Sequence, residues 1–236
     1  MAERTPAWYE GAREAARRGF AARDPADAAQ RSGAAFDAPA GRFVVPMLGR
    51  HYSVSFPAGA VARTDAADAG EEPPIVHQIL LLHYLTLASG LPPRGRWAAF
   101  HELPGGTFHY SSFRARAVVP LAKRFGAQPA EVLAAGRELG GRPFSVGSAG
   151  VVVPALPRVE VGIVVWRGSE EFPPAANLVY DTAAPTYLST EDLENLAIAC
   201  AARVIEVADG RPAVVERLAP PPVAAASTSA VAAAGH

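Results

Sequence analysis

An apolar run from Ile75 to Ala88 constrains the fold of this chain more than any other segment. Pro73-Pro74 precedes it, and proline is favoured at the start of a helix, while Gly90 can end a helix in the left-handed conformation. The apolar residues lie on nearly every helical face, which is typical of a helix surrounded by other elements. The run is shorter than the roughly 20 residues that cross a bilayer, and it contains His77 and His83. We therefore expect a central core helix and no membrane span.

Residues rich in β-branched and aromatic side chains mark short strands on both sides of this helix. Residues 42–56 flank a tight turn at Leu48-Gly49-Arg50, which predicts a hairpin. Further strands are predicted at 151–153, 159–166 and 177–181, with a break at Pro154. The pattern favours an α+β fold. We expect a single compact domain of mainly antiparallel short strands and hairpins packed around the central apolar helix, with helices at both ends.

Capping residues predict several of the other helices. Helix starts are predicted at Thr5-Pro6, at Asp24-Pro25 and at Ser189, where Asp192 completes a capping box. Residues 129–139 form a further short helix closed by Gly140-Gly141. Residues 112–125 are helical in pattern but contain Pro120, which is expected to kink or restart the helix.

The ends and loops of the chain differ in composition from its centre. We expect one globular domain over residues 1–218, with a mobile surface loop at about 62–72, where the residues are small, acidic and unpatterned. From Ala219 onward Pro, Ala, Ser and Thr follow without periodicity, so the segment cannot bury enough apolar surface to offset the entropy of ordering. Residues 219–236 are therefore predicted to be a disordered tail.

The charge and the cysteine content of the chain limit the partners that we expect it to bind and the compartment in which we expect it. The net charge is −1 and 19% of the residues are charged, so we expect no nucleic-acid partner. Cys200 is the only cysteine, which excludes an intramolecular disulfide, and no signal peptide is recognisable, so a cytoplasmic location is expected. Lys123 is the only lysine. The preference for arginine, alongside many Ala, Pro and Gly residues, indicates a GC-rich genome, and single arginines consequently carry little functional weight.

The stretch around Gly105-Gly106 suggests a site because His101, Glu102 and His109 surround it. Two glycines between such flanks predict a tight reversal. In a two-residue turn, Glu102 would face His109 across the hairpin, while His101 would point to the other face. Only two potential ligands would then share a face, so we expect a ligand-facing loop or a structural hairpin, and no metal site.

Several other polar residues are candidates for a functional site, and each also has a structural interpretation. His83 lies in an apolar helix, about 120° from His77, and is either a core residue or an axial ligand for a tetrapyrrole. Glu170 and Glu171 provide a general base or bind a cation, or else they keep a loop solvated, and Asp181 would strengthen the active interpretation if it lay beside them. Four arginines that flank the Gly-Gly segment, Arg94, Arg96, Arg114 and Arg116, are candidates to clamp a carboxylate or phosphate.

From the first hairpin to the last helix the chain carries a series of short motifs. They are Leu82-His83-Tyr84-Leu85, Trp97 to Phe100 with Glu102-Leu103-Pro104-Gly105-Gly106, Phe113 with Pro120-Leu121-Ala122, Val164-Val165-Trp166 before Glu170-Glu171-Phe172-Pro173, then Asp181 and Glu191-Asp192-Leu193. In this order they resemble the bacterial and archaeal domain-of-unknown-function family numbered 3786. Some members are joined to iron–sulfur cluster segments in anaerobes that use corrinoid and one-carbon chemistry, so the resemblance implies an accessory or binding role near a redox or tetrapyrrole cofactor.

We therefore expect a protein that binds a small molecule or cofactor of unknown identity, with a tetrapyrrole- or corrinoid-related ligand implied by the resemblance. The alternatives are an enzyme that uses carboxylates as acid or base and a purely structural or protein-interaction domain. The ligand is expected in a concave site walled by residues 97–110, the central helix and residues 166–174. The candidate ligand-binding residues are His83, Trp97, His101, Glu102, Gly105, Gly106, His109, Arg114, Trp166, Glu170, Glu171 and Asp181.

Overall fold

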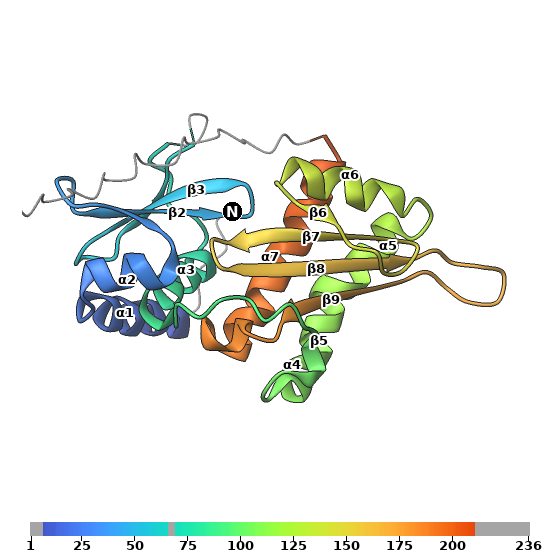
Figure 1. Cartoon of the computed structure of the whole chain (residues 1–236), viewed down its shortest axis with the longest axis horizontal. Helices are drawn as coiled ribbons and strands as arrows, with labels where there is room; N and C mark the ends of the chain where they lie inside the picture. The colour runs from blue at the N-terminus through green and yellow to red at the C-terminus, as the bar shows by residue number, and fades with distance from the viewer. Residues whose placement is uncertain (1–6, 66–68, 211–236) are drawn as a thin grey trace, which may run out of the picture.

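The computed structural model describes residues 7–65 and 69–210, which form two antiparallel sheets and the helices that pack on them (Figure 1). One sheet has four strands in the order β1-β2-β3-β4, and the other has five in the order β5-β9-β8-β7-β6. This arrangement confirms the predicted α+β class. The predicted helix start at Thr5-Pro6 and the predicted tail at 219–236 lie outside the described residues.

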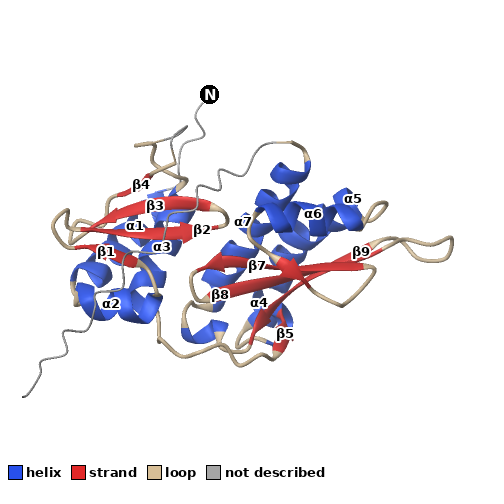
Figure 2. Cartoon of the chain, turned by 45° about the horizontal axis from the view of Figure 1, so that its top comes forward, coloured by secondary structure: helices blue, strands red, loops and turns tan. Residues whose placement is uncertain are grey.

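The N-terminal part of the chain contains the four-stranded sheet and three helices. Its elements are α1 (Ala7–Ala21), α2 (Pro25–Ser32), β1 (Ala35–Asp37), β2 (Arg42–Met47), β3 (Arg50–Ser55), β4 (Val61–Arg63) and α3 (Ile75–Leu87). The helices lie on one face of this sheet (Figure 2). Phe20 of α1 meets Phe43 of β2 edge to face, with ring centroids 5.6 Å apart, so aromatic packing joins the two layers.

The five-stranded sheet and the remaining helices follow. Their elements are β5 (Trp97–Ala99), the 3-10 helix η1 (Phe100–Glu102), α4 (Gly106–Phe113), the π-helical η2 (Arg114–Val118), α5 (Val119–Phe125), α6 (Ala130–Glu138), β6 (Arg142–Pro143), β7 (Ala149–Leu156), β8 (Val159–Trp166), β9 (Ala175–Asp181), the 3-10 helix η3 (Ala184–Thr186) and α7 (Thr190–Ala208).

The predicted hairpin at residues 42–56 is confirmed as β2 and β3. Leu48 and Gly49 form its turn with φ of 53° and 72°, the positive values that a two-residue hairpin turn of type I′ requires. The Leu48 N–H also donates to the carbonyl of Ala155 at 3.1 Å. The tip of this hairpin is therefore fixed to β7, and the two sheets meet at this point.

Helix α3 occupies its predicted place but shares the central position with α7. It packs against α1, α2 and α7, and its apolar residues are buried around most of its circumference. α7 contacts α3, α4, α5 and α6, and it crosses behind the five-stranded sheet (Figure 1). The capping box at Ser189 and Asp192 is confirmed at its start. Gly90 has a φ of +76° as predicted, but α3 already ends at Leu87.

The predicted hairpin at Gly105-Gly106 is wrong. Gly105 is the N-cap of α4 with a φ of +74°, and Gly106 is the first residue of that helix. A Cβ atom on Gly106 would lie 2.0 Å from the carbonyl oxygen of Phe100, so the glycine permits a close backbone approach. The pair therefore starts a helix after the 3-10 turn, and Glu102 and His109 do not face each other across strands.

Two further boundaries differ from the predictions. β7 continues through Pro154 to Leu156, because its outer neighbour β6 pairs only with Val151 and Val152 and leaves no ladder bond for the proline to disrupt. The expected loop at 62–72 begins later, since β4 extends to Arg63, and residues 66–68 lie outside the described part of the chain. Among the described residues, no helix is both long enough and apolar enough to span a membrane.

Candidate functional site

The predicted site residues lie in several separate places. His83 of α3 contacts Asp192 of α7, with Nδ1 2.9 Å from one carboxylate oxygen. The hydrogen bond to Asp192 raises the pKa of His83, against a smaller opposing effect of burial. Ser189 donates to the second oxygen of the same carboxylate at 2.6 Å. This His83–Asp192 pair joins two helices, and its geometry is that of a structural contact.

The candidate residues around Gly105-Gly106 also contact other protein groups. Nδ1 of His109 lies 3.1 Å from Oε2 of Glu194, a carboxylate that is only 8% exposed. Glu102 accepts a hydrogen bond from the backbone N–H of Ala99 at 2.6 Å and so caps η1. His101 meets the ring of Tyr110 edge to face, with centroids 5.5 Å apart, in a shallow exposed depression.

The remaining candidates lie on the five-stranded sheet and its loops. Asp181 accepts hydrogen bonds from the backbone N–H groups of Arg94, Gly95 and Ala183. Burial raises the pKa of Asp181, but these backbone donors together outweigh it and lower the pKa. The Asp181 side chain therefore holds the loop before β5 in place.

The aromatic and acidic candidates on this sheet do not form a common cavity. Trp97 packs against Phe144 with ring centroids 5.1 Å apart. Trp166 is 39% exposed at the end of β8, and Glu170 and Glu171 are exposed in the loop that follows. This loop extends beyond the end of the sheet, whereas α3 packs near the four-stranded sheet (Figure 1). Of all the candidates, Arg114 alone lines a groove beside that loop, next to Pro173 and Pro174.

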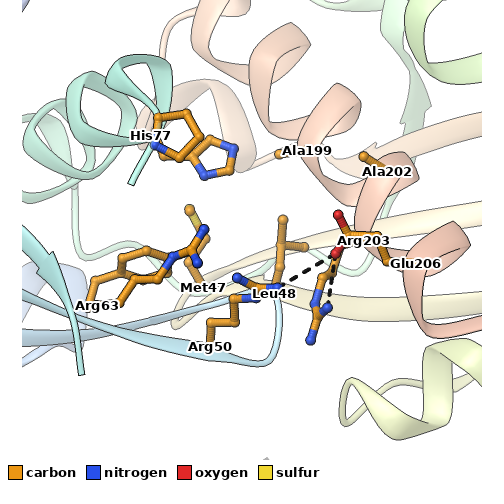
Figure 3. Close-up of a pocket in the computed structure, with 11 residues that line it drawn as sticks. Met47, Leu48, Arg50, Arg63, His77, Ala199, Ala202, Arg203 and Glu206 are labelled. Atoms are coloured by element: carbon orange, nitrogen blue, oxygen red, sulfur yellow. Dashed lines mark hydrogen bonds and ion pairs between the residues drawn. The ribbon is translucent and has the colours of Figure 1, made fainter. Parts of the chain in front are cut away.

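A different pocket lies where the β2–β3 turn, β4, the start of α3 and α7 meet (Figure 3). Its cavity is about 250 Å³ in volume. Its lining residues are Met47, Leu48, Arg50, Tyr52, Arg63, Pro74, His77, Ala199, Ala202, Arg203 and Glu206. The small side chains of Ala199 and Ala202 on α7 leave space across the pocket from Met47 and Leu48 (Figure 3).

Side-chain periodicity brings these residues together. Arg50 and Tyr52 are two residues apart on β3 and so project from the same face of the sheet. Ala199, Arg203 and Glu206 are spaced by four and three residues on α7, which places them on one face of the helix. His77 lies in the first turn of α3, three residues after Pro74. The side-chain periodicities of strands and helices therefore direct residues from four segments into one cavity.

Three guanidinium groups and one carboxylate dominate the electrostatics of this pocket. Glu206 lies 3.1 Å from Arg203 and 3.7 Å from Arg50, and Arg63 lies 3.5 Å from the exposed Glu71. The arginine side chains are only partly exposed, by 6% at Arg203 and 19% at Arg63. Guanidinium groups that are partly withdrawn from water bind carboxylates and phosphates through paired hydrogen bonds. The pocket is thus chemically suited to an anion.

His77 is neutral in this environment. Burial lowers the pKa of His77 to about 4, and the charges of Arg63 and Arg50 act in the same direction. Its Nδ1 atom is buried and has no hydrogen-bond partner among the described residues. Burial also raises the pKa of Tyr52, so its hydroxyl remains protonated. The pocket therefore combines fixed cations with neutral groups that can donate or accept hydrogen bonds.

The sequence carries one weak signal for this pocket. Arg203 falls between Cys200 and Val204, in the apolar stretch of the last helix, and a buried arginine there requires a partner. Because arginine is abundant throughout the chain, Arg203 does not stand out in the sequence. Within the described part of the chain, no three His, Cys, Asp or Glu side chains gather as a metal site requires.

The fold and this pocket define an α+β protein with a cationic cavity between its four-stranded sheet and its last helix. The chain belongs to the family described as "Domain of unknown function (DUF3786)", whose model matches residues 24–203 and confirms the resemblance noted in the sequence. The match includes Arg50, Arg63, His77 and Arg203, while Glu206 lies just beyond it. No curated protein and no solved structure matches the chain.

Proposed function

We propose that this protein binds a small organic dianion, a phosphate monoester or a short dicarboxylate, in the pocket between β3, β4, α3 and α7. The observation that carries the proposal is the convergence of Arg50, Arg63 and Arg203 on one cavity that apolar side chains also line. The lining residues carry three guanidinium groups and the single carboxylate of Glu206, and the exposed Glu71 also lies beside Arg63. Several guanidinium groups at one site favour a ligand with more than one negative charge, because each group can bind a separate anionic oxygen.

The size of the cavity supports a ligand of a few carbon atoms. Pockets that enclose drug-sized ligands span roughly 300–1,000 Å³, and this cavity of about 250 Å³ is slightly smaller. Met47, Ala199 and Ala202 also line the cavity and provide apolar surface for a short carbon chain. A tetrapyrrole ring exceeds this space, and His83, the candidate axial ligand, is not among the lining residues. The pocket therefore favours a small anionic metabolite over a tetrapyrrole.

Calorimetric titration of the full chain tests the proposal. Inorganic phosphate and succinate serve as dianionic probes, and acetate serves as a monoanionic probe of similar donor chemistry. We expect saturable binding of one dianion per chain, with acetate at least about tenfold weaker because it engages fewer guanidinium groups. A preference for phosphate over succinate, or the reverse, identifies which dianion the pocket takes.

Matched arginine variants locate the binding. Arg63→Gln removes one lining guanidinium, and a lost charged hydrogen bond of about 1.5–3 kcal/mol corresponds to about 10- to 100-fold weaker binding. Arg142→Gln makes the same change at a surface residue paired with Glu160 on the five-stranded sheet, and it is expected to bind like wild type. The absence of dianion binding, or equal loss in both variants, contradicts the proposal.

A further inference from the structure

A second cavity runs between the continuous helix α4–η2–α5 and the N-terminal end of β9. It has a volume of about 490 Å³, and residues 173–176 line its strand side. Tyr110, Arg114, Val118 and Ala122 line its helix side at intervals of four residues. Tyr110 is 37% exposed, so the apolar wall is accessible to solvent. This groove is remote in sequence from the arginine pocket and shares no lining residue with it.

The π-helical turn keeps the helix wall of the groove in line. Positions four apart on an ideal α-helix drift by about 40° at each step. The stretch Arg114–Val118 is π-helical, with the N–H of Val119 bonded to the carbonyl of Arg114, and this wider turn offsets part of the drift. Single π turns inside α-helices are frequent at functional sites. The distortion therefore preserves a straight row of side chains along the groove.

The strand side of the groove is a sheet edge. β5 pairs only with residues 179–181 of β9, so residues 175–178 extend past its end. The N–H of Leu178 donates to the side chain of its neighbour Asn177, which shows that it points away from β8. Backbone groups alternate sides along an antiparallel strand, so the N–H and C=O of Ala176 point the same way. Ala176 lines the groove and presents both groups toward it.

Two cations lie on the helix wall. Arg114 and Lys123 are exposed, line the groove, and form no ion pair with any residue in the described part of the chain. Between them lie the apolar side chains of Val118 and Ala122. A surface that combines an open strand edge, an apolar wall and two cations complements an extended polypeptide with acidic and apolar residues.

We propose that this groove docks a short acidic segment of a partner protein in extended conformation, which pairs with Ala176 of β9 and places a carboxylate against Arg114 and Lys123. Pro173 and Pro174 precede Ala176 and have no N–H groups, so pairing cannot continue toward the loop. Prolines at a sheet edge also discourage edge-to-edge association of two copies. The geometry consequently favours a short linear segment over a second copy of this chain.

A phage-displayed library of random dodecapeptides, selected on the full chain, is the probe for this proposal. We expect enriched sequences to carry acidic residues beside β-branched or aromatic ones. An enriched peptide, synthesised with a fluorophore, is expected to bind in anisotropy titrations and to lose at least about tenfold in affinity to the double variant Arg114→Glu, Lys123→Glu, because two attractions become repulsions. Arg116→Glu, on the same helix but outside the groove, is the matched control and is expected to stay within about twofold of wild type.

Ala176→Pro provides an independent check on the strand pairing, since it removes the N–H that would donate a hydrogen bond to a carbonyl of the peptide. The affinity of this variant for the peptide is expected to fall by a similar factor, while circular dichroism reports an unchanged fold. The double charge reversal affects only exposed side chains, so it remains informative if Ala176→Pro does not fold. The proposal is overturned by failure to enrich any sequence, by enrichment of basic or uncharged peptides, by equal loss in the Arg116 control, or by sedimentation that shows a dimer closing the groove.

Discussion

Glu206 of α7 lies 3.7 Å from the guanidinium group of Arg50 at the start of β3, so a single carboxylate connects the last helix to the first hairpin across the candidate pocket. The same carboxylate lies 3.1 Å from Arg203 on its own helix. Glu206 therefore occupies one edge of the cationic cluster and offsets part of its charge.

Removal of this carboxylate is expected to strengthen anion binding. In Glu206→Gln the side chain keeps its size but loses its charge, so Arg50 and Arg203 are no longer partly neutralised from within. We expect the affinity for inorganic phosphate to increase several-fold in calorimetric titrations at about 50 mM salt. Glu160→Gln, at the surface pair with Arg142, is the matched control. Weaker binding in Glu206→Gln would mean that the carboxylate positions the arginines instead of competing for them.

His83 and Asp192 predict a pH-dependent contribution to stability. The contact with Asp192 raises the pKa of His83 in the folded state, so its stabilising contribution is complete below the unfolded value near 6.5 and is lost as the pH rises through the folded pKa. We expect His83→Gln to lower the melting temperature more at about pH 5.5 than at about pH 8.5. Thermal denaturation at both pH values measures this, and a larger loss at the higher pH would contradict it.

His77 predicts the opposite dependence. Its folded pKa is lowered to about 4, so the neutral ring favours the fold above the unfolded value near 6.5, and that contribution is lost as the pH falls toward 4. We expect His77→Gln, which does not titrate, to lose less stability than wild type between about pH 7 and pH 4.5. Urea denaturation at both pH values provides the comparison. Parallel losses in the two proteins would show that His77 already has access to a proton in the folded state.

Gly106 is expected to tolerate no side chain. A Cβ atom would meet the Phe100 carbonyl at 2.0 Å, and backbone cannot rotate away as a side chain can, so Gly106→Ala is expected to cost about 3 kcal/mol. Gly11→Ala is the control, because nothing lies within 4 Å of that position in α1 and alanine favours a helix interior by about 0.5–1 kcal/mol. Denaturant unfolding measures both free energies. Equal stability of Gly106→Ala and wild type would contradict the close approach at η1.

Local signals in the sequence predicted many of the elements but not all of their roles. The hairpin at 42–56, the helix that begins at Ile75 and the capping box at Ser189 were correct because each depends on neighbouring residues alone. The prediction of a turn at Gly106 was wrong for a physical reason. Two adjacent glycines suit a turn, but here one is required by the carbonyl of Phe100, a steric contact that the turn pattern does not reveal.

The sequence signals only one residue of the candidate pocket, Arg203, for a related reason. Arg50, Arg63, His77 and Arg203 lie on four elements, and only the packing of α7 against the N-terminal sheet and helices brings them together. The predicted cluster around His101 and Glu170 assumed a hairpin and an adjacent loop that the fold separates. Pairing across elements depends on register and packing, which single-sequence periodicity does not specify.

Nuclear magnetic resonance of the arginine side chains shows directly whether Arg50, Arg63 and Arg203 bind one dianion. The Nε–Hε signals of the full chain would be followed during titration with inorganic phosphate and with succinate. We expect the signals of Arg50, Arg63 and Arg203 to shift together and to saturate at a single dissociation constant, while that of Arg142 stays in place. Shifts confined to other arginines, or unsaturated drift of all arginine signals alike, would contradict it.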